Sequence, residues 1–295
     1  MVAIILVNYN GAVDTIECIK SLSNINGIDY EIIVVDNCST DDSLSMLKSV
    51  QIDFGFILLI AEINNGFSAG NNIGIRYAKQ KNADYYLLLN NDTVVEPDFL
   101  QYLLDGMNNQ QNCGATTGRI LYYAKPDTIW YAGGALNCKI GRTEHFYYGK
   151  KDTPLQKEPK AVTFISGCCM CLSRILVDEV GLLNEDFFLY EEDAEYCYRI
   201  NKAGFTLLYV PSAIVYHKVG ASTGQGSLMS QYYTIRNKYS LIRDNFRGVA
   251  KLSAYVYNTL QMLFRCIKGQ MSFKCYRAAM NAFWHKEKGK VRTEL

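Results

Sequence analysis

The first hundred residues alternate between apolar runs of strand length and segments with the periodicity of a helix. The expected strands are Val2–Val7, Glu31–Asp36, Phe56–Ile60 and Tyr85–Leu89. The expected helices are Asp14–Leu22, a segment capped by Thr40 or Asp41 that runs to Val50, and one that follows Gly66–Gly70 and ends near Lys79. This order predicts an α/β fold with a Rossmann-like, doubly wound, mostly parallel sheet.

The chain is less regular beyond this point. Residues 113–165 contain three prolines and the pair Gly133-Gly134, which predict hairpins and loops. A helix is expected from Asp193 to Ala203, with Gly204 as the glycine that follows its last turn. We expect the next strand, Phe205–Val210, to end at Pro211, because proline cannot donate to a sheet.

Charge divides the chain into an acidic body and a basic tail. Residues 1–235 contain 17 Lys and Arg against 26 Asp and Glu, a net charge of −9, whereas residues 236–295 contain 13 against 3, a net charge of +10. We therefore expect a catalytic domain over residues 1–240 and a basic amphipathic helical tail over residues 241–295. Such a tail is typical of a segment that binds an anionic surface, although a solvated basic helix has the same composition.

The tail is expected to be helical from Lys251 onwards. Its apolar residues recur on one face at the spacing of a helix, namely Leu252, Tyr255, Val256, Leu260, Leu263, Phe264 and Ile267. The segment is too short for the roughly 20 apolar residues that span a bilayer. It therefore either packs on the catalytic domain or lies in a membrane interface.

The N-terminus and the cysteines both indicate a cytoplasmic protein. Met1 leads directly into the first apolar run, with no basic segment and no small-residue cleavage site before it. Most of the ten cysteines are scattered singly within apolar patterns. Cys168 and Cys171 form a CxxC pair, but no second Cys/His pair has zinc-site spacing, so they are expected to pack as small apolar residues.

Polar residues follow three of the expected strands at the point where each strand ends. They are Asn8-Tyr9-Asn10, Asp36-Asn37 and Asn90-Asn91-Asp92. The carboxyl ends of parallel strands lie on one edge of a sheet, where ligands bind in open α/β folds. The chain lacks the glycine and lysine pattern of a P-loop and the glycine pattern of a dinucleotide fold. The sequence therefore predicts a different kind of nucleotide site at this edge.

Each of these groups has a chemical use in such a site. Asp36 can accept the ring N–H of a uracil or thymine, and Tyr9 can stack on the base. The Asp92 carboxylate can hold a divalent cation, Mg²⁺ or Mn²⁺, beside a diphosphate. The two glycines of Asn64–Asn72 are expected to let the backbone approach a ligand. Taken alone, an Asx turn explains Asn90–Asp92 equally well.

A cluster of carboxylates follows an aromatic segment later in the chain. Glu191, Glu192, Asp193 and Glu195 come directly after Phe187-Phe188-Leu189-Tyr190. Like charges in a partly apolar pocket raise carboxyl pKa values, which suits a general base, and Asp193 and Glu192 are the candidates. An acidic helix N-terminus would have the same pattern.

In combination, these motifs resemble the family 2 inverting glycosyltransferases of the GT-A fold, and among them the bacterial rhamnosyltransferases that build cell-surface polysaccharides. The resemblance extends over residues 2–240. It includes the strand-end motifs above, Asn65-Gly66-Phe67-Ser68-Ala69-Gly70-Asn71, Ser166-Gly167, Tyr190-Glu191-Glu192-Asp193, His217 followed by Gly220-Ala221-Ser222, and Arg236-Asn237.

The resemblance implies roles for individual residues. Asp36 would hold the base, Asp92 the divalent cation, and Asp193 would be the general base; His217 would contact the metal or the diphosphate. The donor site would further include Asn8, Tyr9, Asn10, Asn65, Gly70, Asn71, Asn90, Asn91 and Arg236. One departure is that the family's Asp-x-Asp reads Asn90-Asn91-Asp92 here, and an amide is a weaker metal ligand than a carboxylate.

The expected function is transfer of a sugar, rhamnose from dTDP-rhamnose, to a lipid-linked glycan acceptor, by an enzyme held on the inner face of the cell membrane. A UDP-hexose or UDP-hexosamine transferase would use the same residues. A nucleotidyltransferase is disfavoured because residues 8–13 contain no basic residue. A non-catalytic subunit that binds sugar nucleotides is the alternative from another class, and no nucleic-acid partner is expected.

Overall fold

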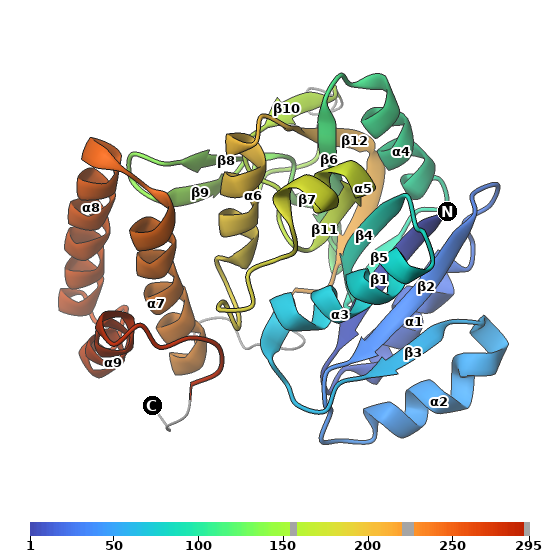
Figure 1. Ribbon diagram of the computed structural model, residues 1–295, viewed down its shortest axis with the longest axis horizontal. Helices are drawn as coiled ribbons and strands as arrows, with labels where there is room; N and C mark the ends of the chain where they lie inside the picture. Colours follow the sequence, from blue (N-terminus) through green and yellow to red (C-terminus); the bar gives the residue numbers. More distant parts are fainter. Residues whose placement is uncertain (154–157, 220–226, 292–295) are drawn as a thin grey trace.

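A mixed β-sheet runs through the centre of the computed structural model, which describes residues 1–153, 158–219 and 227–291 (Figure 1). The strand order is β10-β12-β6-β11-β4-β1-β2-β3, and β5 and β7 pair with β12 and β6 respectively. Strands β4, β1, β2 and β3 are parallel, whereas β11 runs antiparallel to both of its neighbours. The predicted α/β class with a mostly parallel sheet is confirmed.

The N-terminal part alternates strands and helices as expected. Its elements are β1 (Val2–Asn8), α1 (Ala12–Leu22), β2 (Tyr30–Asp36), α2 (Ser43–Phe54), β3 (Ile57–Ile60), α3 (Gly66–Gln80) and β4 (Tyr85–Asn90). Ile4 and Ile5 of β1 and Leu87 and Leu88 of β4 are completely buried. Continuous apolar runs form these strands because both faces of the sheet are covered.

The remaining elements complete the sheet and add a helical layer at one end of the molecule. They are β5 (Thr93–Val95), α4 (Phe99–Asn109), β6 (Cys113–Tyr122), β7 (Lys125–Tyr131), β8 (Gly134–Asn137), β9 (Arg142–His145), β10 (Lys160–Val162), β11 (Cys169–Ser173), α5 (Arg174–Val180), α6 (Glu192–Lys202), β12 (Thr206–His217), α7 (Leu228–Asn245), α8 (Gly248–Ile267) and α9 (Phe273–Trp284). Strands β8 and β9 form a separate hairpin.

The expectation of hairpins and loops from residue 113 is wrong for β6, which is a central strand of the main sheet. Its polar residues hide the apolar pattern of a buried strand. Thr116 and Thr117 are buried because their hydroxyls donate to the carbonyls of Leu103 (3.1 Å) and Cys169 (2.7 Å). Satisfied hydroxyls of this kind can occupy a core that sequence patterns assign to apolar residues.

The expectation that Pro211 ends its strand is also wrong, because β12 continues to His217. The pairing of β12 with β6 shifts register between Val210 and Ile214. A bulge of this kind leaves positions outside the hydrogen-bond ladder, so the missing N–H of Pro211 is tolerated there. The extension matters because it brings His217 to the ligand edge of the sheet.

Helix α3 begins at Gly66, so the expected glycine loop is instead the first turn of a helix. A Cβ at Gly70 would lie 2.7 Å from Val7 Cγ1, and one at Gly66 would lie 1.9 Å from the carbonyl oxygen of Phe188. These glycines therefore allow close packing of α3 on β1 and on the 188 segment. The expected approach of their backbone to a ligand remains a prediction.

The C-terminal helices α7, α8 and α9 lie together at one end of the molecule (Figure 1). Tyr239 of α7, Met262 of α8 and Phe283 of α9 share a second hydrophobic cluster. The expected division at residue 240 falls inside α7, and α8 begins three residues before Lys251. Within the described residues, no helix has both the length and the apolar character needed to cross a bilayer.

The close packing of α3 on β1 leads us to expect that Gly70 tolerates no larger side chain without loss of stability. We expect Gly70→Ala to lower the free energy of unfolding by roughly 1–2 kcal/mol, because overpacking outweighs the better helix propensity of alanine. In a Val7→Ala background the same change should be neutral or stabilising, because the space has been vacated. Urea unfolding of the four proteins measures this. An additive cycle would contradict the packing explanation.

Candidate active site

Side chains from three neighbouring strands meet at one edge of the sheet. Strand β1 lies between β2 and β4, and the register places Asn8 opposite Asp36 and Val7 opposite Asn90. Because the strands are parallel, their carboxyl ends lie on the same side. The convergence expected from the sequence is present.

A chain of hydrogen bonds links these strand ends. The Asn91 amide donates to Thr15 Oγ1 (2.8 Å), and the Thr15 hydroxyl donates to Asn8 Oδ1 (2.9 Å). The Asn8 amide in turn donates to Asp36 Oδ1 (2.8 Å). Asn8, Thr15 and Asp36 are all buried, and a bonded polar network in a buried site is rigid. The network fixes the Asp36 carboxylate relative to the turn after β4.

The loop after β2 closes over Asp36. Ser39 donates to Asp36 Oδ1 through its hydroxyl (2.6 Å) and to Oδ2 through its backbone N–H (3.1 Å). Asn10 and Thr40 exchange two further hydrogen bonds, of 3.1 and 2.8 Å, which join this loop to the end of β1. A carboxylate oxygen has two lone pairs, so Oδ2 can accept one more N–H. Tyr9 is half-buried between Asn8 and Asn10.

Asp92 and His217 lie side by side although they are far apart in the sequence. Strand β12 pairs with β5 so that His217 is opposite Thr93. His217 Nε2 is 3.1 Å from Asp92 Oδ1, and both side chains are 7% exposed. Trp130 packs against the imidazole, with ring centroids 4.7 Å apart. Among the described residues, no group hydrogen-bonds to the buried Nδ1 of His217.

This pair fits a divalent cation such as Mn²⁺, for which a carboxylate oxygen and an imidazole nitrogen are suitable ligands. The described part of the chain contains no group of three or more His, Cys, Asp and Glu side chains that could hold a metal. Asp92 and His217 would therefore supply two ligands, and the other positions would be filled by oxygens of a bound ligand and water.

The carboxylates at the N-terminus of α6 differ in their surroundings. Glu195 forms an ion pair with Arg199 (2.9 Å), which explains its burial. Asp193 Oδ2 accepts a hydrogen bond from the Gly167 N–H (3.1 Å). Glu192 is buried, and its Oε2 has no hydrogen-bond partner within the described residues. Asp193 Oδ1 also accepts the Ala194 N–H (2.8 Å). Within the described residues, Asp193 and Glu192 are the two carboxylates of this segment that form no ion pair, whereas Glu191 and Glu195 each have a cationic partner.

Burial raises the pKa of Asp193, while the N–H groups of Gly167 and Ala194 and the charge of Lys238 oppose this increase. Burial raises the pKa of Glu192 well above its usual range, and the charge of Asp193 adds to the effect. A raised pKa makes a carboxylate a stronger base, available at pH values above that pKa.

Backbone contacts join this acidic segment to the end of β4. The Asn90 N–H donates to the carbonyl of Cys168 (2.9 Å), whose neighbour Gly167 donates to Asp193. The Phe67 N–H at the start of α3 donates to the carbonyl of Phe188 (3.0 Å). The two halves of the site therefore belong to one hydrogen-bonded framework.

Some of the residues expected at the donor site are buried, namely Asn8, Gly70, Asn71 and Arg236. The Asn71 amide donates to the carbonyl of Phe67 (3.0 Å), and Arg236 Nε donates to Asn237 Oδ1 (3.0 Å). Their expected contacts with the donor remain predictions. Asn65 is exposed at the start of α3, and Tyr9, Asn10, Asn90 and Asn91 are at least partly exposed.

Sequence reasoning missed several supporting residues. Thr15 lies in a helix with nothing in its local pattern to mark it, and Lys238 is paired with Glu191 of another segment. Asn237 belongs to a motif of the resemblance but had no expected role, because its hydrogen bonds to the carbonyls of Leu189 and Tyr190 join distant segments. The Gly220-Ala221-Ser222 motif lies outside the described residues. Cys168 and Cys171 are free and buried, and burial raises the pKa of both thiols, as expected for packing residues.

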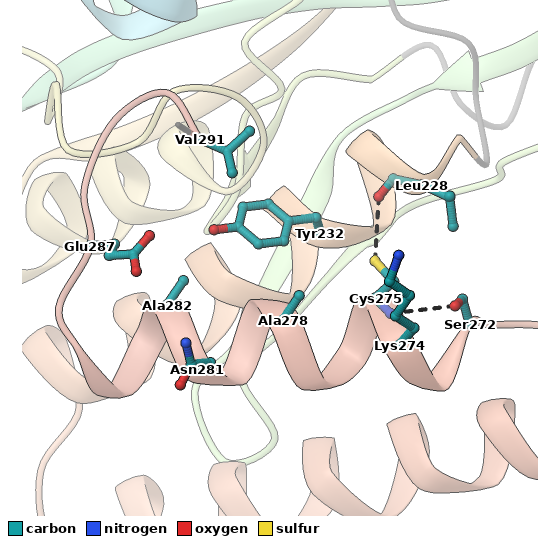
Figure 2. A pocket seen from close by; sticks show the side chains of 10 residues that line it. All are labelled: Leu228, Tyr232, Ser272, Lys274, Cys275, Ala278, Asn281, Ala282, Glu287 and Val291. Atoms are coloured by element: carbon teal, nitrogen blue, oxygen red, sulfur yellow. Dashed lines mark hydrogen bonds between the residues drawn. The ribbon is translucent and has the colours of Figure 1, made fainter. Parts of the chain in front are cut away.

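A pocket of about 200 Å³ lies away from this edge, between α7 and α9 (Figure 2). Figure 2 shows Leu228 and Tyr232 of α7 facing Cys275 and Ala278 of α9 across it. None of the residues expected at the active site lines it. The pocket belongs to the C-terminal helical layer.

The chain belongs to Glycosyl transferase family 2, whose family model matches residues 3–181. It is 27% identical to the low-salt glycan biosynthesis hexosyltransferase Agl10 of Haloferax volcanii, over 88% of this chain and 81% of that protein. It is 24% identical to the dTDP-rhamnosyl transferase RfbF of Shigella flexneri, over 82% and 79%. The poly-beta-1,6-N-acetyl-D-glucosamine synthase of Staphylococcus aureus is 27% identical over 76% of this chain and 51% of its own length.

Solved structures show the same fold. GalNAc-T7, crystallised with UDP, GalNAc and Mn²⁺, superposes with a TM-score of 0.65 at 17% identity, over 98% of this chain and 58% of that chain. Residues 1–349 of S. aureus TarS, in complex with UDP-GlcNAc, give a TM-score of 0.59 at 15% identity, over 97% and 81%. The expected GT-A fold is confirmed, and the protein is a glycosyltransferase of family 2.

Proposed function

We propose that the protein transfers a sugar from a nucleoside diphosphate donor to a hydroxyl of a lipid-linked glycan, with inversion at the anomeric carbon. The observation that supports this best is the placement of Asp36, the Asp92–His217 pair and Asp193 along one edge of the sheet. Family membership supplies the reaction class, and these groups supply the chemistry that the class requires.

Asp36 is proposed to recognise the base of the donor. Its carboxylate is held by Asn8 and Ser39, and Oδ2 can accept the ring N–H of a uracil or thymine. Tyr9 would flank the base. Asp92 and His217 would hold a divalent cation, and Mn²⁺ is present in the structures of GalNAc-T7 and of a Pyrobaculum calidifontis mannosyltransferase. When bound, this cation would stabilise negative charge on the departing diphosphate.

Asp193 is proposed to be the general base. Its carboxylate would take the proton of the acceptor hydroxyl while that oxygen forms a bond to the anomeric carbon and the bond to the diphosphate breaks. The N–H groups of Gly167 (3.1 Å) and Ala194 (2.8 Å) each donate to one carboxylate oxygen, and together they fix the orientation of the carboxylate. Burial raises the pKa of Glu192 beside it well above the usual range, so Glu192 keeps its proton to higher pH than an exposed glutamate does.

The donor is proposed to be dTDP-rhamnose, on the basis of the relative RfbF. Agl10, a hexosyltransferase, and the N-acetylglucosamine synthase support the alternative of a UDP-hexose or UDP-hexosamine donor. The alternative of a non-catalytic subunit requires no general base. The buried Glu192 beside Asp193, whose Oε2 has no hydrogen-bond partner within the described residues, favours an enzyme.

A thermal-shift panel of dTDP, UDP and GDP with Mg²⁺ or Mn²⁺ tests the donor site. A nucleotide at about 100 times its Kd adds roughly 2.7 kcal/mol of stability. Asp92→Ala should abolish the metal-dependent part of diphosphate binding and leave nucleoside binding unchanged. Asp36→Ala should weaken nucleoside and diphosphate alike and reduce discrimination among bases. Equal effects of the two substitutions on both ligands would contradict this division of roles.

Asp193→Asn tests the general base. We expect kcat to decrease by roughly 10²–10⁴, with the donor Kd unchanged, because the amide cannot accept the proton. In the wild-type enzyme the acidic limb of kcat/KM should lie above the usual aspartate range, since burial raises the pKa of Asp193. Transfer by Asp193→Asn at the wild-type rate would show that another group is the base.

The acceptor is proposed to be reached at a membrane surface through α8. This helix packs on the protein through Ala254, Asn258 and Met262 and turns its apolar residues outwards. The exposed apolar stripe consists of Val249, Leu252, Val256, Leu260, Leu263, Phe264 and Ile267. Packing on the catalytic domain and binding at a membrane interface, the two alternatives that the sequence left open, are therefore compatible. One face of α8 packs on the domain, and the other faces solvent.

Charge favours an anionic lipid surface as the partner of this stripe. Residues 245–286 contain seven Lys and Arg and no Asp or Glu. Each basic residue near an anionic leaflet contributes about 1 kcal/mol of binding, and apolar residues that enter the interface add to it. A contiguous stripe of exposed apolar side chains on a surface helix is typical of an interaction site.

Sedimentation with phospholipid vesicles tests this surface. The full chain should bind vesicles of phosphatidylcholine mixed with phosphatidylglycerol and release them at high salt, whereas the double variant Leu260→Glu/Phe264→Glu should not bind. Ile52→Glu, at a more exposed apolar position on α2, is the control and should bind normally. Self-association through α8 without vesicle binding would show that a second copy of the chain covers the stripe instead.

A further inference from the structure

The segment that precedes the proposed base has an unfavourable backbone. Tyr190 and Glu191, directly before α6, have φ angles of 67° and 72°. Residues with a Cβ rarely adopt the left-handed region, and two in succession persist only where the surroundings enforce them. The position of Asp193 therefore depends on what holds residues 189–191.

Helix α7 holds this segment through a buried amide. Asn237 Nδ2 donates to the carbonyls of Leu189 (2.8 Å) and Tyr190 (2.9 Å). Its Oδ1 accepts a hydrogen bond from Arg236 Nε (3.0 Å), which fixes the orientation of the amide. Asn237 and Arg236 are 2% and 1% exposed. Both donor hydrogens of the amide are thus committed to the strained segment.

Helix α7 also supplies a buried cation to the same segment. Lys238 Nζ is 2.6 Å from Glu191 Oε2, and the two side chains are 9% and 10% exposed. The same ammonium group acts on Asp193, where its charge opposes the rise in pKa that burial causes. Lys238 therefore fixes the side chain of Glu191 and favours the ionised form of Asp193.

A ring contact completes the attachment. Phe188 stacks on Tyr233 of α7 with ring centroids 5.0 Å apart, while its carbonyl accepts the N–H of Phe67 on α3. The segment is therefore held from two sides, by α3 of the nucleotide-binding half and by α7 of the C-terminal layer.

We propose that Asn237 and Lys238 are positioning residues for the transfer reaction, which hold residues 189–191 so that Asp193 faces the acceptor hydroxyl in its ionised form. This inference rests on the proposed role of Asp193 as the base. Neither residue is required to touch the substrate. They would act by fixing the backbone that presents the base and by setting the charge beside it.

The first test compares two buried asparagines. Asn237→Leu should lower kcat by roughly 10- to 100-fold and leave the donor KM within about twofold, because the base is displaced and the donor site is not. Asn258→Leu is the matched control. Asn258 of α8 is equally buried, and its amide also donates to two carbonyls, those of Ile140 (2.7 Å) and Ala254 (2.8 Å). This variant should lose similar stability and keep its kcat.

The second test is a pH profile. The ionisable groups whose charges act with that of Asp193 are Glu191, Glu192, Lys238, Tyr131 and Cys197. Lys238→Met removes the one cation among them, so the acidic limb of kcat/KM for the acceptor should move up by about one pH unit. Lys238→Arg should restore it. Arg119→Met, which removes another buried cation paired at 3.0 Å, should leave the limb in place.

The outcomes separate this inference from the proposed function. If Asp193→Asn is inactive while Asn237→Leu and Lys238→Met keep the wild-type kcat and pH profile, positioning by α7 is wrong and the base assignment stands. If Asp193→Asn is fully active, the base assignment itself is wrong. Circular dichroism and melting temperature verify folding, and if Asn237→Leu does not fold, the pH limbs of the two Lys238 variants decide.

Discussion

The parallel pairing of β1 with β2 and β4 is the constraint on which the rest of the site depends. This register aligns Asn8 with Asp36 and brings Asn90 beside Val7. A slip of one residue would turn every side chain of β1 to the opposite face of the sheet. Ile4, Ile5 and Leu6 would stay buried after such a slip, because both faces of the sheet are covered. The slip would, however, break the buried hydrogen bonds that join Asn8 to Asp36 and Thr15, so these bonds help to specify the register.

The buried polar groups at this edge of the sheet are stable because most of them form hydrogen bonds. Leaving a buried amide or carboxylate without a partner costs about 1–3 kcal/mol, and more if it is charged. The chain from Asn91 through Thr15 and Asn8 to Asp36 avoids this cost, which explains why a buried carboxylate is tolerated at the end of β2. Glu192 and His217 each keep an atom without a partner among the described residues, and both stand beside groups with proposed chemical roles.

The sequence predicts those features that local pattern determines. The first four strands, the polar residues that follow three of them, and the helix after Glu191 could all be placed, because each depends on neighbours in the chain. Local pattern could not place His217 beside Asp92, although the resemblance put both near the diphosphate and its cation, because the contact depends on a bulge that carries β12 past Pro211. The close contacts of the α3 glycines with Val7 and Phe188 could not be predicted for a similar reason, because those two residues lie in other segments.

The C-terminal helices support the part of the site that contains the proposed base. Helix α7 holds the strained segment before Asp193 through Asn237 and Lys238, and α8 packs against α7 with its apolar stripe turned outwards. The same layer thus has the proposed base on one side and the proposed membrane surface on the other. An acceptor anchored in lipid has to present its hydroxyl close to the bilayer. A rigid helical layer that contacts both the base and the membrane would keep the base at a fixed distance from that hydroxyl, which a flexibly attached tail could not do.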